Sequence, residues 1–257
     1  MTLVRRGVLL LALPVLLFAA WWVASAGSTD FYWPSLSSIL AAFGRTWTWD
    51  RVQADVLPSL GRLLAGYLLA VVVGVALGAV IGSVRWVRAL VEPLLEFLRA
   101  IPPPVLVPIV ILLSGIGDRT KILVIVSGCV WPVLLNTVEG VRGRDEVLSD
   151  TCRTYGITGP LRLRHLVLRA ASPQIVTGAR QALPIAIILM VISEMMAANE
   201  GLGFTVVQFQ RGFQIPEMWS GVLLLGLVGI LLSLLFRAAE RGLLGWYHGQ
   251  RAGRREW

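Results

Sequence analysis

Residues 60–82 read LGRLLAGYLLAVVVGVALGAVIG, an apolar run that carries a single charge, Arg62, near its start. A helix needs roughly 20 mostly apolar residues to cross a bilayer, and this run is long enough. Small residues recur at every fourth position: Gly66, Ala70, Gly74, Gly78 and Gly82. They form a stripe on one helix face, where backbones can approach closely in lipid. The run predicts a spanning helix packed tightly against another helix of the same subunit, with a seam between two subunits as the alternative.

Five further apolar runs predict a bundle of six spanning helices, an all-α polytopic membrane protein. They cover residues 8–25, 92–114, 121–138, 177–198 and 219–238. The run at 92–114 is interrupted by Ile101-Pro102-Pro103-Pro104, and unwound backbone at membrane depth is tolerated only inside protein or beside water. Pro102 and Pro103 are therefore candidates for lining a translocation path. We expect residues 1–257 to form one transmembrane domain with its core at 55–240.

The composition excludes most other classes of protein. Hydrophobic residues make up 56% of the 257 residues, and only 15% are charged, against roughly 25% in a soluble domain. The mean hydropathy is +0.75. Too few charges are present to cover a soluble core, and the chain is too apolar to be disordered.

The positive charges predict the orientation in the membrane. If the N-terminus is cytoplasmic, fifteen of the 23 basic residues fall in cytoplasmic segments and five in segments on the other side of the membrane. This asymmetry satisfies the positive-inside rule with both ends cytoplasmic. The net charge of +8 then comes from basic cytoplasmic segments that lie next to anionic lipid headgroups. We therefore expect a lipid bilayer, and no nucleic acid, as partner. Arg5-Arg6 and Ala24-Ser25-Ala26 leave a cleavable signal peptide as the alternative to an uncleaved first span.

Catalytic motifs are absent from the sequence. It contains no G-x-x-x-x-G-K-[ST] phosphate loop, no H-E-x-x-H and no G-x-S-x-G, and its cysteines and histidines show no metal-ligand spacing. We expect a chain that is no enzyme and carries neither cofactor nor metal.

Two groups of charges lie in or beside the spans. Glu194 sits inside the fifth span, where a carboxylate is costly. With Met195 it is a candidate for the translocation path, and a buried hydrogen-bonded strut near the outer end is the alternative. At the cytoplasmic end of the third span, one helical turn separates Glu92, Glu96 and Arg99 from one another. We expect these three residues to form a structural ion network.

The longest polar segment, residues 139–176, is the main candidate for function. Within it, residues 147–169 read VLSDTCRTYGITGPLRLRHLVLR. The spacing resembles the cytoplasmic loop of ABC-importer membrane subunits, E-A-A-x3-G-x9-I-x-L-P. The matching positions, with Tyr155 beside the glycine, are Asp150, Thr151, Cys152, Gly156, Leu166, Leu168 and Arg169. Asp replaces Glu, Thr and Cys replace the alanines, Leu replaces Ile, and Arg replaces Pro.

Other stretches between 31 and 240 resemble permeases of the nitrate/sulfonate/taurine type. They are Ser59-Leu60-x-Arg62, the run from Pro93 to Pro102, Gly115-Ile116-Gly117, and Glu194-Met195 followed by Gly201-Leu202-Gly203. The resemblance implies a methionine-importer-like permease fold in the bacterial inner membrane. Its loop would dock on one of two ATPase subunits, which bind ATP and magnesium.

The same resemblance implies a second permease subunit, usually identical, and an extracytoplasmic solute-binding protein. The implied solute is a small anion such as a sulfonate, nitrate or taurine, and a pyrimidine-type or other small vitamin precursor is the alternative. A secondary transporter is a further alternative, but it would have inverted repeats and coupling charges at mid-membrane. No repeat is visible, and only Glu194 could serve as a coupling group.

Overall fold

The computed structural model describes residues 3–245, and every regular element within that range is helical. Short 3-10 or π-helical turns at residues 52–56, 103–105 and 163–167 join some of the helices. The helices are α1 Leu3–Ser25, α2 Leu36–Thr46, α3 Trp49–Arg51, α4 Leu57–Ser83, α5 Arg85–Ala100, α6 Leu106–Ser114, α7 Asp118–Arg142, α8 Glu146–Thr154, α9 Gly159–Arg162, α10 Leu168–Ala197, α11 Leu202–Arg211 and α12 Ile215–Leu243.

Four helical stretches are long and apolar enough to cross a membrane. They are Trp49–Ser83, Asp118–Arg142, Leu163–Met196 and Ile215–Leu243. A fifth span results if the bent pair α5 and α6 is counted as one. The described apolar part of α1, Ala12–Ser25, is shorter than these. The protein is therefore a helical multi-pass membrane protein, and a count of six spans remains a prediction.

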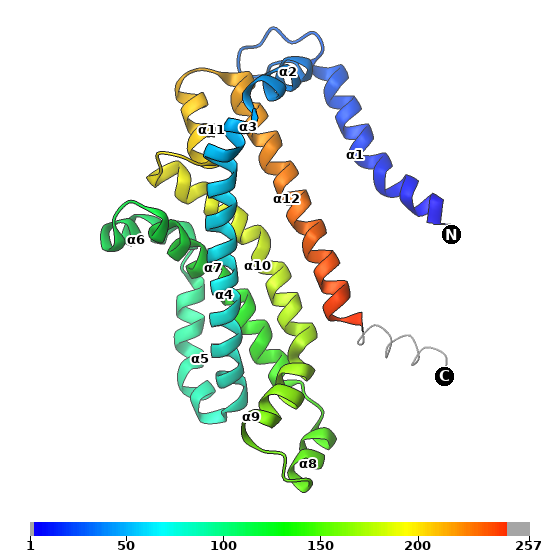
Figure 1. Cartoon of the computed structure of the whole chain (residues 1–257), viewed down its shortest axis with the longest axis vertical. Helices are drawn as coiled ribbons and strands as arrows, with labels where there is room; N and C mark the ends of the chain where they lie inside the picture. Colours follow the sequence, from blue (N-terminus) through cyan, green and yellow to red (C-terminus); the bar gives the residue numbers. More distant parts are fainter. Residues whose placement is uncertain (1–2, 246–257) are drawn as a thin grey trace.

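The third predicted span is not a single helix. Arg85–Ala100 and Pro103–Ser114 meet at an angle of 76°. Ile101 and Pro102 are extended at the break, with ψ values of 118° and 123°. A proline pushes the residue before it out of the helical region and removes one backbone donor. The successive prolines thus end α5 and send α6 away from the bundle axis, as Figure 1 shows.

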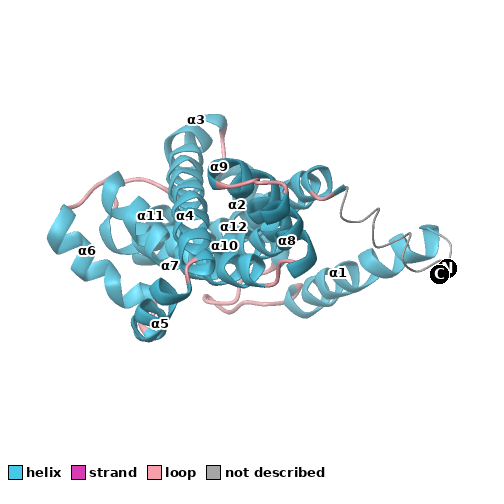
Figure 2. Ribbon diagram, turned by 90° about the horizontal axis from the view of Figure 1, so that it is seen from below, coloured by secondary structure: helices cyan, strands magenta, loops and turns pink. Residues whose placement is uncertain are grey.

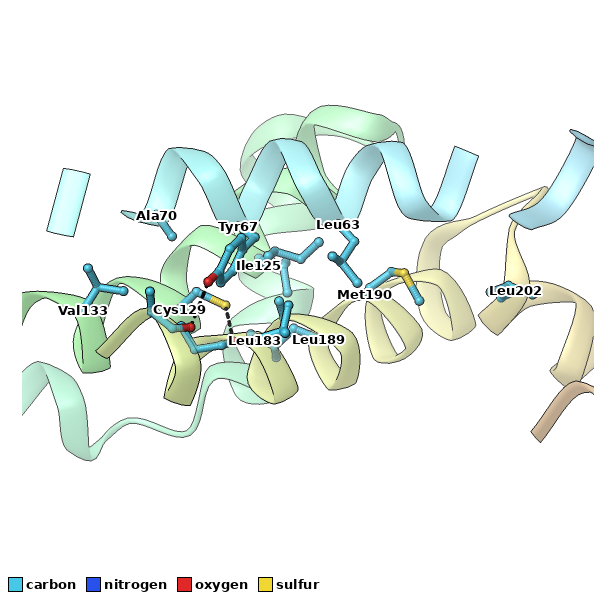
Figure 3. Close-up of a cluster of buried hydrophobic side chains, with 14 of the residues drawn as sticks. Leu63, Tyr67, Ala70, Ile125, Cys129, Val133, Leu183, Leu189, Met190 and Leu202 are labelled. Atoms are coloured by element: carbon cyan, nitrogen blue, oxygen red, sulfur yellow. Dashed lines mark hydrogen bonds between the residues drawn. The ribbon is translucent and has the colours of Figure 1, made fainter. Parts of the chain in front are cut away.

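The core lies among α4, α7 and α10. Figure 3 shows Leu63 and Tyr67 of α4 meeting Ile125 and Cys129 of α7 over Leu183 of α10. The Tyr67 hydroxyl donates to the Ala179 carbonyl at 2.9 Å, and so its polar end is satisfied inside the apolar core. These three helices form the framework on which the other elements are placed.

The stripe of small residues on α4 faces α7 of the same chain. A Cβ added at Gly66 would lie 2.8 Å from Ile125 Cβ, and one at Gly78 would lie 2.6 Å from Thr137 Cβ. Gly74 and Gly82 meet Val133 and Val141 in the same way. The expected seam within one subunit is confirmed, because only glycine lets the two backbones come this close.

The remaining helices attach to the two ends of this framework. In Figure 1, α2 and α11 lie at one end of the long axis, and α8 and α9 lie at the other. Helix α1 diverges from the body in both views (Figure 2). Its end meets the body through aromatic rings, with centroids 6.3 Å apart for Trp21 and Trp33 and 6.2 Å apart for Trp21 and Trp219.

Candidate functional site

The segment that resembles a docking loop forms a separate small unit at the end of the bundle. Helix α8 begins after Asp145, whose side chain accepts from the Val147 amide at 2.8 Å and caps the helix. Asp150 is exposed on α8 and accepts from Arg153 at 3.2 Å. Thr151 is also exposed, whereas Cys152 is half-buried. The loop thus presents a short capped helix beyond the spans (Figure 1).

Helix α8 ends in a turn that depends on Gly156. This residue has a φ of +67°, a conformation that glycine adopts without strain. Tyr155, immediately before it, is 78% exposed, and Val147 is 72% exposed. Apolar side chains held this far outside a folded core are typical of a surface that meets a partner.

The second half of the predicted loop motif belongs to the framework. Leu166 lies in the π-helical turn that leads into α10 and is buried, and Leu168 begins α10 and is half-buried. Val167 between them packs with Val141 and Ala171 in a small apolar cluster. The loop is therefore fastened to α7 and α10 at its base, while α8 stays exposed.

The candidates for the translocation path do not come together in this structure. Pro103 packs toward α7, where a Cβ added at Gly128 would lie 3.1 Å from its ring. Pro102 is exposed at the bend, and Met195 is 42% exposed at the end of α10. A role for these residues in translocation stays a prediction.

Glu194 is fully buried in a hydrogen-bonded cluster near the last residue of α10, and α10 ends on the side of the bundle opposite α8 (Figure 1). Its carboxylate accepts from Ser59 Oγ at 2.7 Å, from an Arg62 guanidinium nitrogen at 3.1 Å and from the Gly203 amide at 2.9 Å. These donors come from α4 and from the start of α11. The geometry is that of a buried strut, the alternative reading of this residue, and its carboxylate is enclosed by protein.

Arg62 joins four parts of the chain through this cluster. Besides Glu194 on α10, its guanidinium donates to Asp118 at the start of α7 at 2.7 Å and to Glu200 before α11 at 2.5 Å. Its side chain is only 5% exposed. The guanidinium group has five N–H donors, and four hydrogen bonds to these three residues, one of them to the Glu200 carbonyl, offset part of the cost of burying its charge.

Sequence reasoning missed this cluster as a unit. It singled out Glu194 but gave no partner, although Arg62 is the one charge in the opening run and Asp118 lies just before the fourth predicted span. Charges at the borders of separate spans were the available signal, since intramembrane ionisable groups pair with one another. Their pairing was out of reach, because Arg62 and Glu194 are 132 residues apart in sequence.

The predicted ion network is formed in part. Glu96 accepts from Arg99 at 3.1 Å, and the two line a cavity of about 160 Å³ between α5 and α7. Glu92 lines the same cavity but forms no ion pair with a described side chain. Within the described part of the chain, no cluster of three or more His, Cys, Asp or Glu residues could hold a metal ion.

A bundle of apolar helices with a capped, exposed helix at one end is the architecture of a multi-pass membrane protein that presents a surface outside the spans. The family described as the binding-protein-dependent transport system inner membrane component matches residues 70–243, and the chain belongs to that family. It is the permease subunit of an ABC importer and a transport component, as the sequence predicts. ATPase and binding-protein partners follow in general terms from the family.

The chain is similar to several permeases that are named for a transported solute. The taurine transport permease TauC of Escherichia coli K12 is 30% identical over 79% of this chain and 72% of its own. SsuC of the same organism, named as a putative aliphatic sulfonates transport permease, is 29% identical over 92% of both chains. The bicarbonate permease CmpB of Synechococcus elongatus is 31% identical over 74% of this chain and 69% of its own.

The fold is that of a solved importer. A chain of the methionine ABC transporter MetNI in an inward-facing conformation superposes with a TM-score of 0.65 at 19% identity. The match covers 75% of this chain and 95% of that one. The expected methionine-importer-like fold is therefore confirmed.

Proposed function

We propose that this permease imports a small anion, of the sulfonate, taurine, nitrate or bicarbonate kind, across a bacterial inner membrane. The relatives named for aliphatic sulfonates, taurine and bicarbonate support this class of solute. In the proposed assembly two identical copies of the chain form the path, and two ATPase subunits bind ATP and magnesium. Six spans would leave both ends in the cytoplasm.

The exposed helix α8 with its Gly156 turn is the observation that carries the proposed energy coupling. Val147 and Leu148 are exposed on it, and Tyr155 follows at its end. A short helix with unburied apolar side chains suits a groove on a partner protein. Movement of the ATPase pair would then pull α8 and tilt the attached spans between two arrangements.

The docking role is tested by Gly156→Val. Valine is strained at a φ of +67°, so the turn after α8 should change its conformation and the ATPase should bind the permease less well. We expect loss of solute uptake in proteoliposomes and loss of ATPase co-purification, with a normal amount of permease in the membrane. A bulky residue at Cys152 should act in the same way.

Thr158→Val is the matched control, since it introduces the same side chain two residues further on, where φ is not positive. Normal uptake by Gly156→Val would contradict the docking role. If the permease alone, without any ATPase, accumulates solute against a gradient, ATP-driven import itself is wrong. The solute is identified separately, by measuring which ligand the associated binding protein holds.

A further inference from the structure

A basic cavity of about 500 Å³ lies between the start of α5 and the docking helix α8. Ser149 and Asp150 line it together with five arginines. The arginines come from the start of α5, the end of α7, the loop after it, α8 and α9: Arg85, Arg142, Arg144, Arg153 and Arg162. Such a concentration of guanidinium groups favours a ligand that is negatively charged.

Three of these arginines have no counter-charge among the described side chains. Arg142 is paired with Glu139 at 2.8 Å and Arg153 with Asp150 at 3.2 Å. Arg85, Arg144 and Arg162, in contrast, form no ion pair with any side chain that the structure describes.

Unused hydrogen-bond donors point to the same kind of ligand. Arg162 Nε and Ser149 Oγ are buried and have no hydrogen-bond partner among the described residues. Buried polar atoms are rarely left unsatisfied, because the loss of water is then not compensated. Helix α5 also begins at Arg85 without a side-chain cap, and an uncapped helix start favours an anion. An anionic group with several oxygen acceptors fits all of these donors.

A separate apolar groove of about 760 Å³ lies along the spanning helix α4. Val72, Ala76 and Val80 are among the residues that line it. Val84 and Leu163 also line the groove, and they are the chain neighbours of Arg85 and Arg162 in the basic cavity, so the groove and the cavity are adjacent. Trp86, next to Arg85, is 70% exposed, as suits a side chain at the membrane surface.

We propose that the cavity and the groove together bind one anionic phospholipid. Its phosphate would lie among Arg85, Arg144 and Arg162, and one acyl chain would follow the groove on α4. A soluble anion or an acidic segment of the ATPase could use the cavity, but neither would use an apolar groove at bilayer depth. The headgroup would touch Ser149 on α8 and brace the docking helix against the spans.

The test is native mass spectrometry of the assembled transporter, titrated with dioleoyl-phosphatidylglycerol and dioleoyl-phosphatidylcholine. We expect the anionic lipid to be retained roughly tenfold more strongly or better, since each basic residue near an anionic headgroup contributes about 1 kcal/mol, which is roughly fivefold. Arg85→Gln combined with Arg162→Gln should weaken its binding on the order of 20- to 30-fold, since each arginine beside an anionic headgroup contributes roughly fivefold. Arg88→Gln is the control, because it removes the same charge from α5 but lines a different cavity.

The groove is tested separately with Ala76→Phe, which fills it from an exposed position and should not disturb the core. Leu77→Phe, its exposed neighbour outside the groove, is the control and should bind the lipid normally. We expect dihexanoyl-phosphatidylglycerol and glycerol phosphate to compete poorly, since they lack a long chain.

Equal binding of the two lipids, or unchanged binding in the double arginine variant, would overturn the proposal. Effective competition by glycerol phosphate would overturn it in favour of a soluble anion. Lipid that binds the permease alone but is excluded from the assembled transporter would overturn it in favour of an acidic segment of the ATPase or a second permease copy.

Discussion

At the scale of single residues, Arg62 and Glu194 show how a charge pair is kept inside an apolar bundle. Glu194 accepts from three separate donors, and Arg62 reaches three carboxylates. Gly201 makes room for this arrangement, since a Cβ there would lie 2.5 Å from the Glu194 carboxyl carbon. Its φ of +114° also suits glycine alone.

Arg62→Gln should destabilise the protein strongly, because it leaves the buried Glu194 carboxylate without a counter-charge. We expect the free energy of unfolding to fall by about 3–5 kcal/mol, measured by denaturant unfolding in detergent. Glu194→Gln in the same chain should recover part of the loss, since no charge is then left unpaired. The control Arg99→Gln breaks an exposed pair with Glu96 and should cost less than about 1 kcal/mol. Equal losses for Arg62→Gln and Arg99→Gln would contradict this account.

At the scale of helices, the contact of α4 with α7 is set by four glycines. Each has a side chain or carbonyl of α7 within 3.2 Å of where its Cβ would be. Lipid supplies no hydrophobic force between helices, and so close packing must hold them together. This explains why the small residues repeat at the helical period over the whole span.

Gly78→Ala should weaken this contact. Its Cβ would lie 2.8 Å from the Leu134 carbonyl oxygen, which belongs to the backbone and cannot rotate away. We expect a loss of about 1–3 kcal/mol in thermal or denaturant unfolding. Gly61→Ala, on the same helix with nothing within 4 Å, should instead be neutral or gain up to about 1 kcal/mol. If both variants behave alike, the seam is not tightly packed.

The sequence predicts such helices well and their joints less well. Apolar length located α4, α7, α10 and α12, because a spanning helix must be apolar over a fixed distance. It placed the start of α10 at residue 177, whereas the helix begins at Leu168. A helix can continue into water with polar side chains, and hydropathy does not register that extension. The bend before α6 was visible as prolines, but its angle depends on packing.

The candidate site was predictable to a similar degree. The spacing around Gly156 located the exposed helix and its turn, because the left-handed conformation requires a specific residue type. The ion cluster around Arg62 was not predictable, since its members come from four elements that only the folded chain brings together. The basic residues at 251–255 that supported the orientation lie outside the described residues, and so that support is untested by the structure.

At the scale of the whole molecule, two helices stay largely uncovered. Only 6% of the most apolar window of α12 is buried, against 44% for α7. Leu13, Leu16 and Leu17 of α1 are all more than 60% exposed. Lipid or a second permease subunit covers such surfaces in the membrane.

We expect two identical permease copies in each transporter. Two differently tagged copies of this chain, expressed together with the ATPase, should be recovered together when either tag is captured. Native mass spectrometry of the product should show two permeases and two ATPase chains. Recovery of a single tag, with a different permease in the second place, would contradict the identical pair.

The loop that contains α8 is connected at both ends to closely packed helices. It follows the C-terminus of α7 and precedes the N-terminus of α10, and these two helices pack against each other and against α4. A force on the exposed helix α8 therefore acts on α7 and α10 at the same time. If one of these helices slid along its neighbour, side chains would collide with the glycine positions where the backbones are in contact. Rotation of α4, α7 and α10 together as one rigid body avoids that collision.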